Sequence, residues 1–293
     1  PRRGRVSMNR GLSAESRSVS RSRFTAAFTP CSKSTKGSLC QSRCRSSSRV
    51  TSSPGRSSRH SSPLKGCPCR FTRTPAFLKA EFCAGCHQFA ADGFALNGKL
   101  LENTYDEWRG SRFAREGVQC QDCHMPERRH RWRGIHDADM VRSGLTIAVK
   151  PGAARYRPGE IAVVTLRVTS TRVGHAFPTY VTPRVVLRGE LVDETGLAIE
   201  GSRQEKIVGR QVTLDLSREV FDTRLHPGQS AVLTFRVKVP APGIRARLVV
   251  VVEPEAFYVG FFETLLRQGA GRGESDIKKA LDGQRDGHML PWV

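Results

Sequence analysis

Hydrophobic and polar residues alternate with a period of two over much of the second half of the chain. The alternating runs lie at residues 145–150, 161–170, 184–193, 231–239 and 246–254. Turn-forming segments rich in proline and glycine, such as PAPG, separate these runs. The pattern predicts an antiparallel β-sandwich of immunoglobulin-like size, although no Cys…Trp…Cys pattern accompanies it, so the likeness is one of architecture.

Residues 104–117 have a different periodicity. Tyr105, Trp108 and Arg112 follow the i, i+3, i+7 spacing of one helix face, and Gly117 marks an end. We therefore expect one amphipathic helix in this segment. A second short helix is predicted near the C-terminus, at residues 275–283.

Serine and arginine dominate residues 1–72. This segment has 16 lysines and arginines and one acidic residue, Glu15, so about +15 of the net charge of +21 lies here. It has too few apolar side chains to offset the entropy of an ordered chain, so we expect it to be disordered. The predicted fold class is α+β in three parts: a disordered segment at 1–72, a small mainly helical or coil module at 73–143, and a β-sandwich with a short C-terminal helix at 144–293.

The composition changes abruptly near Thr74. This change favours out-of-frame translation of a GC-rich coding sequence as the origin of residues 1–72. A flexible linker and a tail that binds nucleic acid through its charge are the alternatives, and no specific nucleic-acid partner is expected. No run of about 18 apolar residues is present, so no transmembrane segment is expected. No apolar core of a signal peptide is visible either.

Two CxxCH motifs carry the candidate chemistry, in FCAGCHQF at 82–89 and QCQDCHMP at 119–126. In a c-type haem site, two thiols bond to the vinyl groups of the haem and the adjoining histidine binds the iron. The sequence therefore predicts two haem c groups. The residues that would hold them are the thiols of Cys83, Cys86, Cys120 and Cys123 and the imidazoles of His87 and His124. The other five cysteines all lie in 1–72 and show no convincing metal or disulfide pattern.

Zinc is the main alternative for the CxxC pairs, as part of a structural site with four cysteine ligands. The 33 residues between Cys86 and Cys120 exceed the usual spacing of such sites, which is about 15–20 residues. The histidine after each pair also favours haem. A thioredoxin-like redox site is weaker still, because neither pair lies in a βαβ context.

Three further histidines are candidates for the second axial positions: His130, His136 and His175. His136 lies 12 residues beyond His124, which is far enough to reach another haem or the opposite face. His130 adjoins two arginines, and a solvated basic loop is an equal alternative for it. His175 lies in VGHAFPT, where glycine and proline interrupt the strand pattern; a structural role is its alternative.

The segment NTYDEWRGSRFAREGVQCQDCHMP, with the histidine downstream of it, resembles multihaem cytochromes c of the cytochrome c554 type. In these proteins an EW…S helix precedes the C-Q-D-C-H-M-P motif. The later VGHAFPT is similar to a GH-x-F-P-T segment of the β-domain that often follows such haem modules. The resemblance runs from about Thr74 to the C-terminus.

This resemblance implies that His87 and His124 are proximal ligands and that His136 and His175 are candidate distal ligands. Members of the family commonly carry several closely packed haems and are exported before haem attachment. The expected location is therefore the periplasm, or another exported site of a bacterium. With two motifs and no export signal, the chain is expected to be a reduced member or one whose upstream haem motifs were lost.

Electron transfer is the function that these features favour, since two axial histidines leave no open coordination site on the iron. The expected partners are redox proteins, either other cytochromes or a quinol-linked donor at the membrane. The enzymatic alternative is a multihaem oxidoreductase that acts on small nitrogen compounds at an open-faced haem. No obvious set of substrate-positioning acids and bases surrounds the motifs, so a carrier without catalysis is favoured.

Overall fold

The computed structural model of the protein describes residues 74–127, 129, 133–269, 271–284 and 288–292. The folded part is one compact unit, Pro75–Val293. The segment 1–72, for which disorder is predicted, lies outside the described residues. The fold is mixed α+β, as the sequence predicts, with antiparallel sheets.

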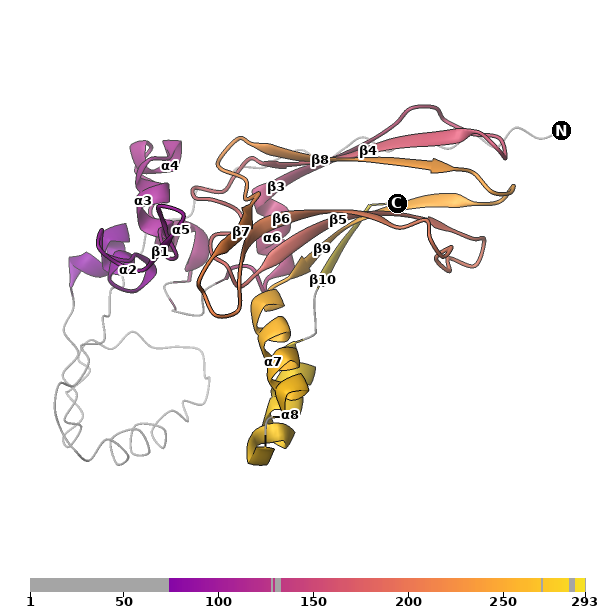
Figure 1. Cartoon of the computed structure of the whole chain (residues 1–293). Helices are drawn as coiled ribbons and strands as arrows, with labels where there is room; N and C mark the ends of the chain where they lie inside the picture. The colour runs from indigo at the N-terminus through magenta and orange to yellow at the C-terminus, as the bar shows by residue number, and fades with distance from the viewer. Residues whose placement is uncertain (1–73, 128, 130–132, 270, 285–287, 293) are drawn as a thin grey trace, which may run out of the picture. The chain divides into compact units, whose positions relative to one another are not determined.

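Short helices and one small hairpin make up the first part of this unit (Figure 1). Its elements are η1 (Pro75–Leu78), α2 (Ala80–His87), β1 (Ala95–Leu96), β2 (Lys99–Leu100), α3 (Thr104–Arg109), α4 (Arg112–Arg115), α5 (Cys120–His124) and α6 (Ala138–Gly144). The boundary predicted between residues 143 and 144 falls inside the compact unit, where α6 leads directly into the first long strand.

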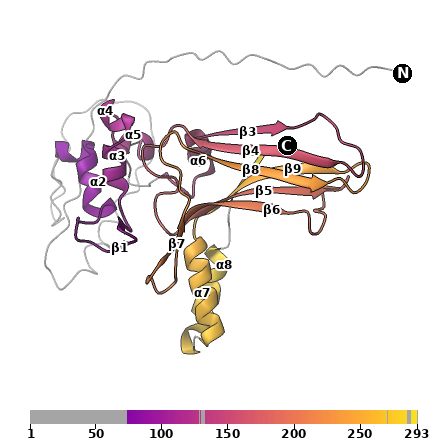
Figure 2. The ribbon, with the colours of Figure 1, turned by 45° about the horizontal axis from the view of Figure 1, so that its top comes forward.

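Two antiparallel sheets follow, and Figure 2 shows them face to face. The three-stranded sheet has the order β3-β4-β8, with β3 (Leu145–Pro151), β4 (Ile161–Ser170) and β8 (Ser230–Lys238). The five-stranded sheet has the order β10-β9-β5-β6-β7, with β10 (His288–Trp292), β9 (Arg245–Glu253), β5 (Arg184–Val192), β6 (Gln204–Val212) and β7 (Glu219–Asp222). Five of these strands match the predicted runs closely, and β6, β7 and β10 are additional.

Side chains from both sheets form one hydrophobic core. Leu166 of β4 and Phe235 of β8 are fully buried in it, together with Val250 of β9 from the opposite sheet. At Gly189 of β5 a Cβ atom would lie 2.7 Å from Cδ2 of Phe235, so this glycine makes room for the phenyl ring. The two sheets therefore form a sandwich closed by apolar side chains.

The sequence patterns predict the helices incorrectly at two places. The single helix expected at 104–117 is two helices, α3 and α4, interrupted at Gly110 and Ser111; Gly110 donates its backbone N–H to Asp106 at the end of α3. Between β9 and β10 the chain also forms α7 (Ala256–Gln268), η2 (Gly271–Gly273) and α8 (Glu274–Gln284).

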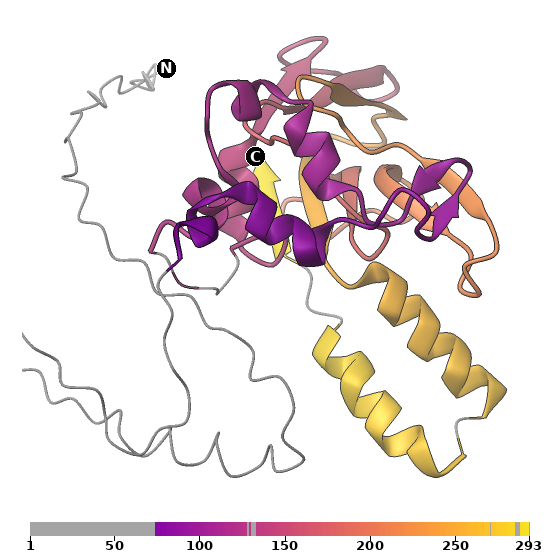
Figure 3. The same cartoon turned by 90° about the vertical axis from the view of Figure 1, so that its left-hand side faces the viewer.

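Helices α7 and α8 pack against each other as a hairpin that projects from the sandwich (Figure 3). The short C-terminal helix expected at 275–283 corresponds to α8, whereas α7 was not expected. Within the part of the chain that the structure describes, no helix combines the length and the apolar composition needed to cross a membrane.

Candidate functional site

Each CxxCH motif lies on a short helix that ends at the motif histidine. Helix α2 carries Cys83, Cys86 and His87, and α5 consists of the second motif alone, Cys120–His124. On α2 the first thiol is buried and the second is exposed, whereas on α5 the first is half-buried and the second is exposed. The sequence pattern thus becomes a compact turn of helix in both places.

Two glutamines of the second motif join the two motif helices. Gln121 is fully buried, and its Nε2 donates to the backbone oxygens of Phe77 and Lys79, each at 2.8 Å. The side-chain oxygen of Gln119 accepts the N–H of Ala80, the first residue of α2, at 2.9 Å. The motif spacing does not reveal this role, because it identifies only cysteine and histidine positions. The contacts place α2 and α5 side by side.

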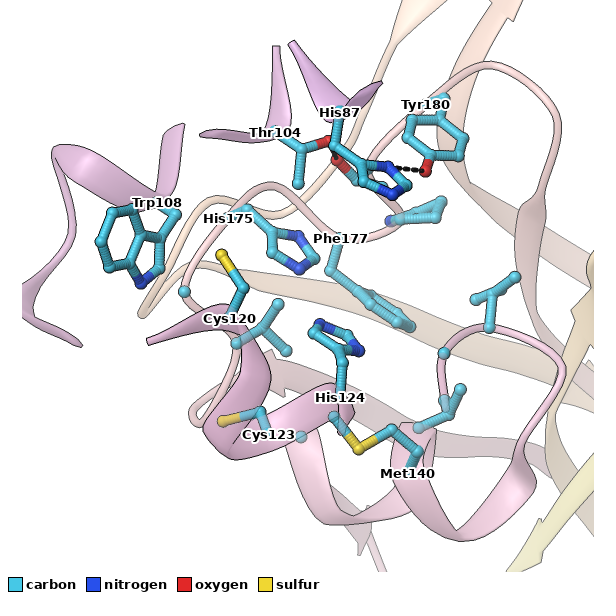
Figure 4. A pocket seen from close by; sticks show the side chains of 18 of the residues that line it. His87, Thr104, Trp108, Cys120, Cys123, His124, Met140, His175, Phe177 and Tyr180 are labelled. Carbon is cyan, nitrogen blue, oxygen red and sulfur yellow. Dashed lines mark hydrogen bonds between the residues drawn. The ribbon is translucent and has the colours of Figure 1, made fainter. Parts of the chain in front are cut away.

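Both motifs border one cavity of about 420 Å³, which lies where the helical part meets the sandwich (Figure 4). The predicted site residues that line it are Cys83, His87, Cys120, Cys123, His124, His136 and His175. Apolar side chains, including Trp108, Phe113, Val141 and Phe177, make up much of the remaining wall. A cavity with apolar walls and a few converging polar groups is typical of a cofactor site.

The rings of His124 and His175 face each other across this cavity. Their centroids are 6.1 Å apart and their planes differ by 17°. Figure 4 shows a ring nitrogen of each histidine directed toward the other ring. His124 comes from α5, and His175 comes from the loop between β4 and β5. The structure thus brings together two residues that the sequence singled out independently.

Hydrogen bonds fix which nitrogen of each ring carries its proton. Nδ1 of His124 donates to the backbone oxygen of Arg133 at 2.5 Å, and Nδ1 of His175 donates to the backbone oxygen of Ala176 at 2.9 Å. Burial lowers the pKa of His124 to about 4 and also lowers the pKa of His175. Both imidazoles are therefore neutral at pH 7, and their Nε2 atoms carry the lone pairs that metal ligation requires.

The loop that carries His175 is held from both sides. Glu107 of α3 accepts the N–H of Ala176 at 2.9 Å, and Nη1 of Arg224 donates to the backbone oxygen of Thr179 at 2.7 Å. At Gly174 a Cβ atom would lie 3.2 Å from Cδ1 of Trp108, so the loop backbone packs closely against α3. These contacts preorganise the imidazole of His175.

Tyr180, at the end of the same loop, lies beside the first motif. Its Oη is 3.3 Å from Nδ1 of His87 (Figure 4). Burial, and after it the nearby Glu102 carboxyl, raises the pKa of Tyr180 to about 12, so its phenol is neutral. One loop of the sandwich therefore reaches both motif histidines.

The other two candidate ligands are placed differently. His136 lines the cavity, but its side chain is 65% exposed and its Nε2 is 2.9 Å from Oε1 of Glu255. His130 lies outside the described residues. Both assignments stay predictions.

The four motif cysteines do not assemble a zinc site. In the described residues no group of three or more histidine, cysteine, aspartate or glutamate side chains is arranged to hold a metal ion. A zinc centre with four cysteine ligands needs all four thiolates within bonding distance of one ion. The structure gives the zinc alternative no support.

No family profile and no curated protein sequence matches the chain. Among solved structures, the chain is similar to a penta-haem cytochrome c552 from Thermochromatium tepidum, with 17% identity and a TM-score of 0.48 over 74% of this chain. The match spans 57% of that protein. It is also similar to an ApaA protein from Bordetella pertussis, with 14% identity and a TM-score of 0.22 over 51% of this chain and 88% of that one.

A third likeness is to the sporulation control protein Spo0M from Bacillus subtilis. It has 11% identity and a TM-score of 0.16, and it covers 37% of this chain and 42% of that one. These three likenesses have TM-scores below 0.5. The geometry of the site itself therefore has to support any functional assignment.

Proposed function

We propose that the protein is a c-type cytochrome that transfers electrons through two covalently attached haems. Cys83 and Cys86 would attach one haem and Cys120 and Cys123 the other, with His87 and His124 as the axial ligands that follow the thiols. When bound, haem supplies reversible one-electron chemistry. The observation that carries the proposal is the facing pair His124 and His175, with ring centroids 6.1 Å apart.

This pair fits an iron ion between its two rings. Imidazole–metal bonds of about 2.0 Å, with the ring radius added on each side, place coaxial ring centroids about 6 Å apart. Hydrogen bonds at Nδ1 hold His124 and His175 in this arrangement, which supports the proposal of a metal ion between them.

The surroundings favour electron transfer over catalysis. With His124 on one face and His175 on the other, both axial positions at the second motif would be filled, which leaves no position for a substrate. Trp108, Phe113 and Phe177 line the cavity with apolar side chains. The chain's contribution is to bind, orient and shield the redox group.

A count of covalent haems tests the proposal. The pyridine haemochrome assay on protein matured with an export signal is expected to give two haems per chain, with none removed by acid–acetone extraction. Replacing His175 with alanine is expected to change the low-spin spectrum of one haem only. An extractable cofactor, or an unchanged spectrum in His175→Ala, would contradict the assignment.

A second candidate function is favoured by the placement of His136. This side chain pairs with Glu255 and is largely exposed. An iron held by His87 whose distal face His136 leaves open would bind small molecules, including small nitrogen compounds. Cyanide or nitric oxide added to the reduced protein tests this: binding at one haem supports an oxidoreductase, and no binding at either haem supports the carrier.

We also propose that the protein acts in an exported compartment such as the bacterial periplasm. The expected partners are other cytochromes or a quinol-linked donor at the membrane. The resemblance of the two motif segments to exported multihaem cytochromes supports this. Redox exchange with such a partner in vitro, at a rate that falls with ionic strength, would test it.

A further inference from the structure

The two motif histidines have different hydrogen-bond acceptors at Nδ1. His124 donates to a backbone carbonyl oxygen at 2.5 Å, whereas the atom near Nδ1 of His87 is the phenol oxygen of Tyr180 at 3.3 Å. A histidine that binds a metal through Nε2 carries its proton on Nδ1, and the acceptor of that proton sets how much charge the ring donates to the metal. The two sites are therefore unequal.

A phenol oxygen is a weaker acceptor than a peptide oxygen, because its lone pair is shared with the aromatic ring. The longer distance at Tyr180 weakens the interaction further. Weaker charge donation from His87 stabilises the ferric state less. The reduction potential at the first motif is therefore higher than that at the second.

We propose that Tyr180 is a positioning residue for His87, and that its weak contact lowers the reduction potential at the first motif by less than the Arg133 carbonyl lowers that at the second, so that the first potential lies above the second. The inference deepens the proposed function and rests on it. When loaded with haem, each site would take up one electron, from ferric to ferrous, and His87 would keep its proton on Nδ1. Electrons that enter at the second motif would then move to the first.

The Tyr180→Phe variant tests this with the loss of a single hydroxyl group. Without the phenol oxygen the His87 ring has a weaker partner, so the potential at the first motif is expected to shift upward while that at the second stays unchanged. Redox titration of the haem-loaded protein measures both. The His175→Ala variant, which alters only the second site, assigns the two components. Tyr258→Phe is the matched control, since Tyr258 lines the same cavity but is 40% exposed.

No shift, a downward shift, or equal shifts at both motifs in Tyr180→Phe would overturn the inference while two covalent haems per chain would leave the proposed function standing. A haem count other than two would instead overturn the proposed function. A second measurement needs no variant: in the reduced protein, proton NMR is expected to show a nuclear Overhauser effect between the Nδ1 proton of His87 and the Tyr180 ring. Its absence would also overturn the inference.

Discussion

Glu107 of α3 accepts the backbone N–H of Ala176, the residue next to His175, at 2.9 Å. Its other carboxylate oxygen is 3.3 Å from Nη1 of Arg224. A carboxylate from the helical part thus holds the loop of the sandwich that carries a proposed ligand. The contact holds the backbone directly next to His175.

Replacing Glu107 with alanine is expected to release this loop. The N–H of Ala176 would lose its partner, at a cost of about 1–3 kcal/mol. We expect a fraction of the protein to lose His175 ligation, seen as a high-spin component in the absorption spectrum of one haem. Because burial raises the pKa of Glu107, the neutral Glu107→Gln variant, which keeps an acceptor oxygen, should retain the low-spin spectrum. Equal spectra for the two variants would contradict this role.

Arg210 of β6 holds the β1–β2 hairpin against the sandwich. Its fully buried guanidinium donates to the backbone oxygens of Leu96, Lys99 and Leu100 and forms an ion pair with Glu219 at 2.8 Å. Arg210→Met would remove this ion pair and the donor to three backbone oxygens, while Glu219 would keep Lys99 at 2.8 Å, so the free energy of unfolding should fall by about 1–3 kcal/mol. Urea denaturation measures it. Arg245→Met is the control, because Arg245 is exposed on β9; an equal loss there would contradict the role.

The carboxyl of Glu102 is expected to make the free energy of unfolding depend on pH. Burial is the main cause that raises its pKa from 4.5 to about 7. Because the folded state favours the protonated carboxyl, the contribution of Glu102 to the free energy of unfolding should fall as the pH rises from about 4.5 through 7.

Glu102→Gln removes this titration and keeps an acceptor for Thr104, which donates to Glu102 at 2.9 Å. Its stability relative to the unmodified protein should therefore increase between pH 5 and pH 8, as followed by urea denaturation at both values. Glu116→Gln, at an exposed position, should show no such trend. A constant difference for Glu102→Gln would disprove the assignment.

A methyl group added at Gly189 is expected to disturb the packing of the sandwich core. Its Cβ would lie 2.7 Å from Cδ2 of the fully buried Phe235, so Gly189→Ala should lower the free energy of unfolding by about 1–3 kcal/mol through overpacking. Gly283→Ala, where no atom lies within 4 Å of the added methyl group, is the control. Thermal denaturation compares the two, and the added substitution Phe235→Leu should recover part of the loss in Gly189→Ala.

The strands that the sequence predicted are those whose apolar residues alternate toward the core. Strand β6 escaped prediction because its pattern includes Arg210, a charged residue that the sheet buries through an ion pair with Glu219 formed only in the folded protein. Helix α7 was not predicted, and none of its residues is buried in the structure. Local patterns do not report such tertiary contacts.

In the site, as in the fold, the sequence predicts what neighbouring residues determine. It does not predict what contacts between distant segments determine. Spacing alone identified Cys83, Cys86 and His87, because the three residues share one turn of helix. The facing of His124 and His175 depends on how the β4–β5 loop packs against α3, and no local pattern encodes that. Tyr180 had no sequence signal at all, because its relation to His87 exists only after the loop has folded.

Because the β4–β5 loop is attached to the helical part, the segment proposed to bind haem would not form a complete site by itself. A chain cut after residue 143 would keep all four thiols and His124 but would lack His175, which the sandwich supplies. Such a fragment would retain its colour yet expose an iron face to peroxide and carbon monoxide. Proper folding of the β-domain would thus protect the carrier from unwanted side reactions.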